Sequence, residues 1–422
     1  MLTSRNPRAA CRLRPFRFLS LAAVISLISL IAACGGGGGG GNSSGSSGSN
    51  SSSSASPSPT QQPVAVNAAN TVSVTVDRGL TGTLPNIPTV SVKVCVTGTC
   101  QTVDHVQVDT ASFGLRLLAS ALPSAFLQAL PPVKANNGGN LAECAAFADG
   151  YTWGSVRSAD VNIGGETAPS IPIQVIGDLT TTVPQACTGF GVAQDTVAQL
   201  GANGILGIGV APYDTTSDYY SCPGNTNCSA TSVTQSSQLV TNPVRKFTTD
   251  NNGVILEMAP VSDSGAPSAT GTLVFGIGTQ SNNAMNAGQR FATDSFGRLS
   301  GTLNGRTLDT FLDSGSNAIF FVDSSLPQCG GNLGSFYCPS ATQSFTATLT
   351  PYGGGASGTA VFNVANANAL LGGGSNYAAN DLAGQFGSSA SLDLGLSFFY
   401  GRYVYYGMDQ TGSGGKPPYV AF

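Results

Sequence analysis

The chain has 422 residues, of which only 9% are charged and 55 are glycine. Its 17 basic and 21 acidic residues give a net charge of −4. This balance argues against a nucleic-acid-binding protein, which needs a basic surface. The weakly charged, glycine-rich composition is typical of a β-rich exported protein.

The first 33 residues have the pattern of an export signal. Five arginines precede an apolar run over residues 19–31, which is too short for a typical membrane-spanning helix. The run ends in Ile31-Ala32-Ala33-Cys34, which resembles a bacterial lipobox. We therefore expect residues 1–33 to be a lipoprotein signal peptide and Cys34 to be lipidated. An uncleaved signal anchor is the alternative interpretation.

Lipid on Cys34 would attach the protein to a membrane of the bacterial cell envelope, either at the periplasmic face of the outer membrane or at the cell surface. Stable anchoring would need more than one acyl chain. Residues 34–63 are rich in Gly and Ser and predict a flexible tether. Without the signal, 12 basic residues face 21 acidic ones, a net charge of −9, so we expect no nucleic acid as partner.

From residue 64 onward, short alternating apolar runs separated by turn residues predict an all-β chain. Residues 90–96 and 103–108 flank Thr97-Gly98-Thr99 and predict a β-hairpin. Further strands are expected at residues 156–163, 171–176, 254–258, 272–275, 307–312, 318–322, 344–349 and 403–406. Helices are expected only at residues 117–130, 192–200 and 397–400.

The chain has ten cysteines, of which Cys11 would leave with the signal and Cys34 would carry lipid. An even number of remaining cysteines in an exported protein predicts disulfides. Close spacing favours three pairs and leaves a fourth as a long-range bridge: Cys95–Cys100, Cys222–Cys228, Cys329–Cys338 and Cys144–Cys187. Metal binding is the alternative, but the chain has no Cys-x-x-Cys and one histidine, so we expect no metal or cofactor.

Two short motifs carry the chemistry. Asp109-Thr110-Ala111-Ser112 and Asp313-Ser314-Gly315-Ser316 each follow an apolar, strand-like run. Small residues let two such loops approach each other, and hydroxyls supply donors to buried carboxylates. Two carboxylates in contact share one proton, so one can take a proton from water while the other polarises a carbonyl. Such a pair titrates as a unit, and neither aspartate is assigned a fixed role.

With these motifs the chain resembles the pepsin-like aspartic proteases. Four further segments occur in the order of that family, and the resemblance covers about residues 90–422. They are Gly98-Thr99 in the hairpin before Asp109, the flap-like Tyr151-Thr152-Trp153-Gly154-Ser155, Asn203-Gly204-Ile205-Leu206-Gly207, and a C-terminal segment that begins at Leu394-Gly395 and ends at Val420-Ala421-Phe422.

The resemblance implies an all-β, bilobal pepsin-like fold with a few short helices, in which residues 64–285 form the N-terminal lobe and residues 286–422 the C-terminal lobe. Asp109 and Asp313 would meet in a cleft as the catalytic pair. Thr110 and Ser314 would donate to the opposite loop, Ser112 and Ser316 would bond the outer carboxylate oxygens, and the small Gly315 would allow close approach. Tyr151 and Trp153 would act from the flap.

The implied function is that of a lipid-anchored aspartic endopeptidase, a monomer that hydrolyses a peptide or protein lying extended across its cleft. Two residues depart from the family pattern. Ala111 replaces a glycine, and Asp393 places an acid in the apolar-apolar-Gly element of the second half. They favour the alternative, a catalytically inactive pepsin-fold protein that binds a peptide or envelope partner. Whether residues 64–88 act as an inhibitory prosegment stays open.

Overall fold

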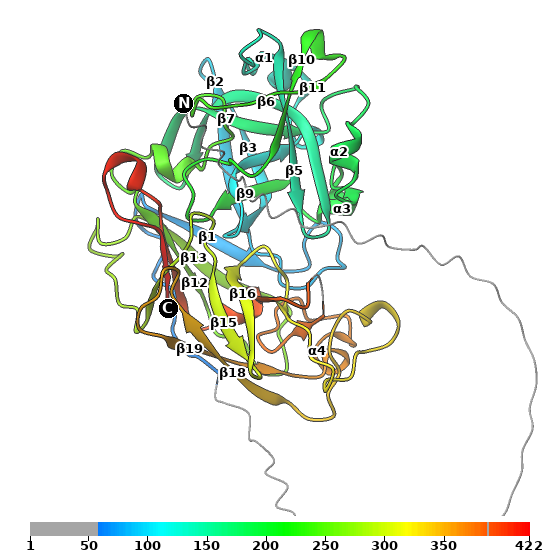
Figure 1. The fold of residues 1–422 in the computed structure, drawn as a ribbon, viewed down its shortest axis with the longest axis vertical. Helices are drawn as coiled ribbons and strands as arrows, with labels where there is room; N and C mark the ends of the chain where they lie inside the picture. Colours follow the sequence, from blue (N-terminus) through cyan, green and yellow to red (C-terminus); the bar gives the residue numbers. More distant parts are fainter. Residues whose placement is uncertain (1–57, 386–387) are drawn as a thin grey trace, which may run out of the picture. The chain divides into compact units, whose positions relative to one another are not determined.

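A computed structural model describes residues 58–385 and 388–422 of the chain (Figure 1). The expected signal peptide, the expected lipidation site Cys34 and the expected tether up to residue 57 lie outside the described residues. Within the described residues most regular structure is strand, which confirms the expected all-β class. None of the helices in this part of the chain is long and apolar enough to cross a membrane.

The larger of two sheets has 16 strands, and six of them close into a ring. The ring follows the pairings β6–β7–β4–β9–β3–β2 and is closed by pairing of β2 with β6. Its strands are β2 (Thr89–Val96), β3 (Thr99–Asp109), β4 (Phe113–Leu118), β6 (Gly150–Ile163), β7 (Glu166–Ile176) and β9 (Gly204–Ile208). β2 and β3 form the expected hairpin.

The same sheet continues from β2 across the molecule, in the order β1, β13, β12, β22, β23, β14. In Figure 1, β1, β13 and β12 lie between the ring and the strands of the second sheet. The remaining strands of the larger sheet are β1 (Thr71–Val76), β5 (Asn140–Phe147), β8 (Val192–Ala193), β10 (Asp218–Cys222), β11 (Ser229–Ala230), β12 (Gly253–Met258), β13 (Ala269–Phe275), β14 (Arg290–Ala292), β22 (Tyr403–Gly407) and β23 (Tyr419–Ala421). The larger sheet therefore contains strands from before residue 285 and, in β14, β22 and β23, strands from after it. The sheets do not divide the chain at this residue, so the lobe boundary at residue 285 stays a prediction.

The smaller sheet has seven strands in the order β19-β18-β15-β16-β21-β17-β20. They are β15 (Leu299–Leu303), β16 (Arg306–Asp313), β17 (Ile319–Phe320), β18 (Gln343–Thr350), β19 (Gly358–Val364), β20 (Ala383–Gly384) and β21 (Ser391–Gly395). Two aromatic residues of the hairpin β18–β19, Phe345 and Phe362, stack with ring centroids 5.7 Å apart and pack on Phe321. The predicted strand pattern of this half is therefore realised as one sheet with an apolar core.

The helices are short: α1 (Ser124–Ala129), α2 (Gln185–Thr188), α3 (Val197–Leu200) and α4 (Ala367–Leu371), with single 3₁₀ turns elsewhere. The helix expected over 117–130 is wrong in its first part, because residues 113–118 form β4. All six residues of β4 are buried, and a short apolar run buried on both faces has no periodicity that separates strand from helix. The helix expected over 192–200 shrinks to α3, and residues 396–398 form a 3₁₀ turn.

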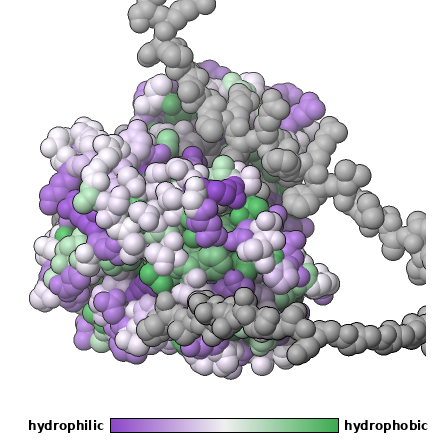
Figure 2. Space-filling model, turned by 60° about the horizontal axis from the view of Figure 1, so that its bottom comes forward, coloured by the Kyte–Doolittle hydropathy of each residue, from purple (hydrophilic) through white to green (hydrophobic). Residues whose placement is uncertain are grey.

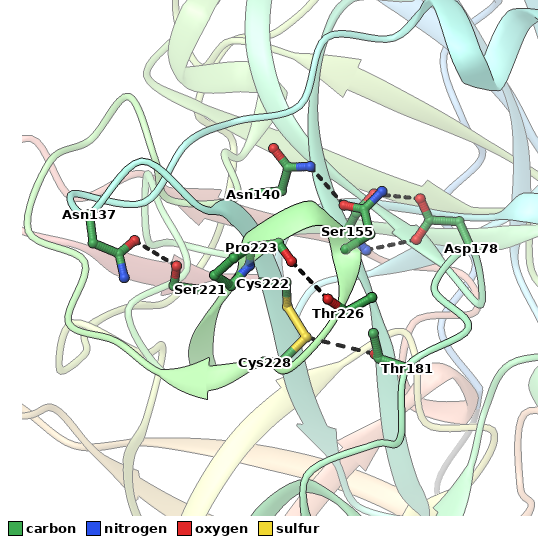
Figure 3. The surroundings of a disulfide bond; sticks show 11 residues. Asn137, Asn140, Ser155, Asp178, Thr181, Ser221, Cys222, Pro223, Thr226 and Cys228 are labelled. Atoms are coloured by element: carbon green, nitrogen blue, oxygen red, sulfur yellow. Dashed lines mark hydrogen bonds between the residues drawn. A yellow bond between two sulfur atoms is a disulfide. The ribbon is translucent and has the colours of Figure 1, made fainter.

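Four cysteine pairs lie at disulfide distance, and they are the four expected pairs. Cys144–Cys187 joins β5 to α2, while the other three each close a short loop. Figure 3 shows Cys222–Cys228 at the end of β10, where Thr181 Oγ1 lies 3.7 Å from Cys228 Sγ. The long-range pair constrains a surface segment that has little regular structure of its own.

Residues 64–88 are built into the folded body. β1 pairs along its whole length with β13. Asn86, fully buried at φ +56°, donates from Nδ2 to the carbonyls of Asn317 and Ala379, both at 2.9 Å. Its Oδ1 accepts from Tyr400 at 2.8 Å. Removing this segment would take a strand out of the sheet and leave buried polar groups unpaired, which does not fit a cleavable inhibitory segment.

The molecular surface carries little charge. Figure 2 shows a face on which hydrophilic and hydrophobic residues are interspersed. The large apolar side chains with the greatest exposure are scattered over the chain: Val66, Leu80, Leu84, Val192, Met285, Phe296 and Tyr352. Scattered apolar residues of this kind are normal on a folded protein and do not by themselves mark a binding surface.

Candidate active site

Asp109 and Asp313 stand at equivalent places in their sheets. Each is the last residue of its strand, β3 or β16. Asp109 lies opposite Gly207 of β9, and Asp313 lies opposite Gly395 of β21, both in parallel pairings. A Cβ at either glycine would come within 2.6 Å and 2.0 Å, respectively, of the loop backbone that follows the aspartate. The two halves of the chain thus use one local plan to hold an aspartate.

Reciprocal hydrogen bonds hold the two aspartate loops together. Ser314 Oγ donates to the Val108 carbonyl at 2.7 Å, and Thr110 Oγ1 donates to the Leu312 carbonyl at 3.4 Å. Thr110 Oγ1 also accepts from the backbone N–H of Ser314 at 2.9 Å. Both hydroxyls are buried, so each bond forms where water cannot compete. These contacts join the strand ends that carry the two aspartates.

Two further side chains, whose role the sequence did not reveal, donate hydrogen bonds to the backbone next to Asp313. Gln107, on β3, donates from Nε2 to the carbonyl of Gly315 in the opposite loop at 2.9 Å. Tyr406, on β22, is buried and donates its hydroxyl proton to the Leu312 carbonyl at 3.0 Å. Gln107 lies in the strand before Asp109, and Tyr406 lies in the C-terminal segment of the resemblance, but nothing in the sequence marks either as a contact of the aspartate loops.

The two carboxylates face one point. An ideal Cβ on Gly315 would lie 2.9 Å from Asp109 Oδ1 and 3.1 Å from Asp313 Oδ1, so only glycine fits between them. Asp109 Oδ1 accepts backbone N–H bonds from Ala111 and Ser112, at 2.9 and 3.2 Å. Asp313 Oδ1 accepts from the N–H of Gly315 at 2.8 Å. The structure therefore brings the two predicted aspartates together across the chain.

Burial, and next the negative charge of Asp109, raise the pKa of Asp313 to about 8. Hydrogen bonds from Ser316 and Gly315 oppose this rise, but they are outweighed. At neutral pH the pair therefore keeps a proton, and Asp313 is the side chain that favours it. A buried pair in this state has one group that can accept a proton and one that can donate.

The two serines that end the motifs differ. Ser316 Oγ lies 3.0 Å from Asp313 Oδ2, where the resemblance predicted a donor. The hydroxyl of Ser112 is buried and has no hydrogen-bond partner among the described residues, so its predicted bond to Asp109 is absent. Ser112 Oγ points toward β9, where it lies 2.7 Å from the ideal Cβ position of Gly207. Only the backbone of Ser112 serves the carboxylate.

Asp393 joins the site as a third carboxyl group. Ser316 Oγ lies 2.6 Å from Asp393 Oδ2, so one hydroxyl touches both Asp393 and Asp313. Burial, followed by the charge of Asp313, raises the pKa of Asp393 well above its usual range. The sequence showed that Asp393 stands where the family pattern has an apolar residue. This difference from the pattern did not reveal that Asp393 lies beside the aspartate pair.

Tyr151 and Trp153 both lie on β6, next to the hairpin turn that β5 and β6 form. Their side chains are buried in a cluster with Cys144, Cys187 and Tyr220, in which Trp153 and Tyr220 pack edge to face at 5.2 Å. This position gives both residues a packing role in the hairpin. Their contact with a substrate stays a prediction.

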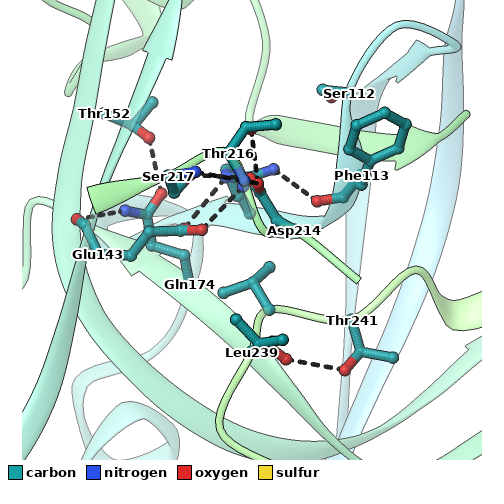
Figure 4. A network of polar contacts seen from close by, with 12 residues as sticks. Ser112, Phe113, Glu143, Thr152, Gln174, Asp214, Thr216, Ser217, Leu239 and Thr241 are labelled. Carbon is teal, nitrogen blue, oxygen red and sulfur yellow. Dashed lines mark hydrogen bonds and ion pairs between the residues drawn. The ribbon is translucent and has the colours of Figure 1, made fainter. Parts of the chain in front are cut away.

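A buried ion network supports the first aspartate loop, and the sequence analysis missed it (Figure 4). Arg116 of β4 is fully buried and pairs with Glu143 of β5 at 2.9 Å and with Asp214. It also donates to the carbonyl of Phe113, directly after the loop, at 3.0 Å. Burial disfavours the charge of Arg116, yet the two carboxylates raise its pKa, so it stays ionised. Charged residues inside the apolar runs 113–118 and 140–147 were the available signal.

No group of three His, Cys, Asp or Glu side chains that could hold a metal ion occurs in the part of the chain that the structure describes. Two strands from separate sheets each supply one aspartate to a shared buried site, which is the arrangement that the resemblance to the pepsin-like fold implied.

The chain belongs to the family described as "Protein of unknown function (DUF3443)", whose model matches residues 66–422. No curated protein matches the chain. Solved structures that match include the crystal structure of an aspartic proteinase from Irpex lacteus, with 17% identity and a TM-score of 0.49, over 84% of this chain and 97% of that chain. We therefore take the function from the geometry of the site.

Proposed function

We propose that this protein is an aspartic-type endopeptidase that uses Asp109 and Asp313. The observation that carries the proposal is the pair itself, in which two carboxylates from separate strands face one point across Gly315. The hydrogen bonds of Thr110 and Ser314 keep the loops in register. Such cross-bonding is expected where two buried acids must stay in contact despite their repulsion.

In the proposed reaction the pair holds one proton and activates a water molecule between its members. The ionised carboxylate takes a proton from the water as its oxygen attacks the carbonyl carbon of the peptide bond, while the protonated carboxyl donates to the carbonyl oxygen. The carboxyl group that took the proton from water gives it to the leaving nitrogen as the carbon–nitrogen bond breaks. The tetrahedral intermediate returns a hydroxyl proton to the other carboxylate, which restores the pair with one proton. The raised pKa of Asp313 favours Asp313 as the protonated member of the pair in the resting enzyme.

We extend the proposal to the place of action. The lipobox-like Ile31-Ala32-Ala33-Cys34 and the Gly/Ser-rich residues 34–63 support a lipid-anchored enzyme in the bacterial cell envelope that works as a monomer on peptides or proteins. Metabolic labelling with a fatty acid tests the anchor. Label should enter the wild type and be absent from the Cys34→Ala variant. Equal labelling of the two would contradict the anchor and leave the peptidase proposal untouched.

The decisive experiment replaces each aspartate of the pair. D109N and D313N should each lower cleavage of a mixed peptide library by more than about a thousandfold, because loss of a general acid–base group typically costs 10²- to 10⁴-fold. The matched control is D309N, since Asp309 lies on the same strand as Asp313 but has a half-exposed side chain. Melting temperatures of all variants check that the fold survives.

Undiminished peptide cleavage by both D109N and D313N would contradict the proposal. A wild-type protein that cleaves no peptide over a wide pH range, yet binds one, would establish the alternative of a catalytically inactive pepsin-fold binding protein. Ala111 is the observation that favours this alternative, because its methyl group stands where the second loop has Gly315.

A further inference from the structure

The second aspartate loop contains a hydroxyl that two carboxyl groups share. Ser316 Oγ lies 2.6 Å from Asp393 Oδ2 and 3.0 Å from Asp313 Oδ2. A serine hydroxyl has one proton and can donate to only one of them. The second contact is a hydrogen bond only if the other carboxyl group donates to Ser316 Oγ. At least one of the two acids must therefore be protonated in this arrangement.

The surroundings of each oxygen indicate which acid donates. Asp313 Oδ1 lies on the side of Asp109, so a proton that the pair shares lies on this oxygen. Asp313 Oδ2 is then free to accept a hydrogen bond from Ser316 Oγ. A proton on Asp393 Oδ2 then points at Ser316 Oγ. The chain of donors runs from Asp393 to Ser316 to Asp313. Every polar atom in it is satisfied except Asp393 Oδ1, which is buried without a partner, and an uncharged acid tolerates that better than a carboxylate does.

The surroundings of Asp393 favour its neutral form. Asp393 is only 8% exposed, and its neighbours across β16 and β17 are Phe311 and Phe320. The titratable groups that act on this corner are Asp313, Asp109 and Tyr406, and none of them is a cation. Burial and the charge of Asp313 accordingly raise the pKa of Asp393.

The first lobe shows what this position holds when no acid is present. Asp393 lies two residues before Gly395, and Ile205 lies two residues before Gly207, each on the strand paired in parallel with an aspartate strand. Ile205 is an apolar residue that is 4% exposed. In that lobe the hydroxyl of Ser112 has no hydrogen-bond partner within the described part of the chain, whereas in the second lobe the hydroxyl of Ser316 contacts both Asp313 and Asp393.

We propose that Asp393 is a positioning residue which, as an uncharged acid, donates to Ser316 and so directs the Ser316 hydroxyl at Asp313. The proposal rests on the proposed function, in which Asp313 is the protonated member of the pair. Its consequence is a limit at high pH. When Asp393 ionises, it competes for the proton of Ser316 and places a second negative charge beside Asp313.

The test compares three variants by their kcat/KM over a wide pH range. D393N keeps a donor toward Ser316 but cannot ionise, so its alkaline limb should move to higher pH. D393I copies the residue of the first lobe and removes the donor. Its kcat/KM should fall about two- to tenfold, the range for a hydrogen bond between uncharged groups. S316A should lose a similar factor, and D393I with S316A should lose no more than S316A alone.

D309N serves again as the control and should leave the profile unchanged. A merely structural role of Asp393 would lower activity without moving the alkaline limb. An unmoved alkaline limb in folded D393N, or full additivity of D393I and S316A, would overturn the proposal.

A second readout does not depend on turnover. In the infrared spectrum at neutral pH, a band of a protonated carboxyl group should disappear in D393N and shift to higher frequency in S316A, where the acceptor is lost. A different band should disappear in D313N. A wild type that shows the Asp393 band but cleaves no peptide would refute the proposed function alone. A spectrum that D393N leaves unchanged would refute the role of Asp393, whatever the activity.

Discussion

The two aspartate loops share a backbone plan and differ in their polar surroundings. Asp109 and Asp313 each end a strand opposite a glycine, and each loop donates a hydroxyl to the other. Around Asp109 the donors to the carboxylate are backbone N–H groups. Around Asp313 they include a side-chain hydroxyl that also touches Asp393. A repeated plan can thus place two identical side chains in unequal environments.

The difference has a chemical use. Two carboxyl groups in equivalent surroundings would share a proton without preference, whereas a group whose neighbours oppose ionisation keeps it. Burial and the negative charge of Asp109 make Asp313 the side chain of the pair that keeps the proton. In the proposed reaction, the second loop is therefore the half that supplies the protonated carboxyl group.

The largest expected effect comes from filling the space between the carboxylates. In G315A the new methyl group would lie within about 3 Å of both aspartates, closer than packed atoms approach, so the pair must separate. We expect cleavage to fall by about a hundredfold or more, since displacements near 1 Å cost that much. The comparison is A111G, which makes the first loop resemble the second and should change activity far less. Equal effects of the two would show that the loops are not distinct. Peptide cleavage at saturating substrate, with melting temperatures alongside, measures this.

The support of the first loop can be broken without touching the pair. R116M leaves Glu143 and Asp214 buried without their cation, and breaking a buried ion pair in this way costs about 3–5 kcal/mol. Urea unfolding should show a loss of this size. The control R298M removes a surface pair at 3.5 Å with Asp309 and should cost less than about 1 kcal/mol. Similar losses of unfolding free energy in R116M and R298M would mean that the buried ion network does not stabilise the first lobe.

The unequal protonation predicts how stability depends on pH. The pKa values of Asp313 and Asp393 are higher in the folded chain than in the unfolded one, so the folded chain binds more protons above the ordinary range of a carboxyl group. The free energy of unfolding should therefore fall as pH rises from about 4 toward 8 and beyond. Denaturant unfolding at a series of pH values measures the slope. D393N should have a shallower slope than the wild type, and a steeper one would contradict the assignment.

The smallest effect concerns the two motif serines. S112A removes a buried hydroxyl that has no partner, so the free energy of unfolding should stay equal or rise by about 1 kcal/mol. S316A removes a hydroxyl bonded on both sides and should lower it by about 1–2 kcal/mol. Thermal or urea unfolding of both variants decides. A larger loss for S112A than for S316A would reverse our comparison of the loops.

Much of this arrangement followed from local pattern. The period-two alternation in residues 90–96 predicted a strand, and the matching aspartate motifs predicted the pair, because both signals lie in neighbouring residues. The all-β class is confirmed. The last two residues of β4 were assigned to a helix because an all-buried apolar run carries no periodicity. Contacts such as Asp393 with Ser316 join residues far apart in the sequence, and no local pattern specifies them.

The direction in which a side chain points was the other feature that the sequence did not predict. Ser112 and Ser316 occupy the same place in similar motifs, yet one hydroxyl points toward β9 and the other toward two acids. What differs is a residue on a neighbouring strand, Asp393 in one lobe and Ile205 in the other. A motif match therefore predicts the backbone of a loop better than the hydrogen bonds within it.

The buried amide of Asn86 also bears on the order in which the chain is made. Asn86 belongs to the first part of the folded body to be synthesised, yet it bonds Ala379 and Tyr400, close to the last residues. Tyr406, which steadies the strand end before Asp313, is later still. A nascent or truncated chain that ends before residue 400 lacks the Tyr400 and Tyr406 contacts, so Asn86 loses a buried partner and the strand end before Asp313 loses a hydrogen bond. The last residues to be synthesised thereby contribute to the surroundings of the site.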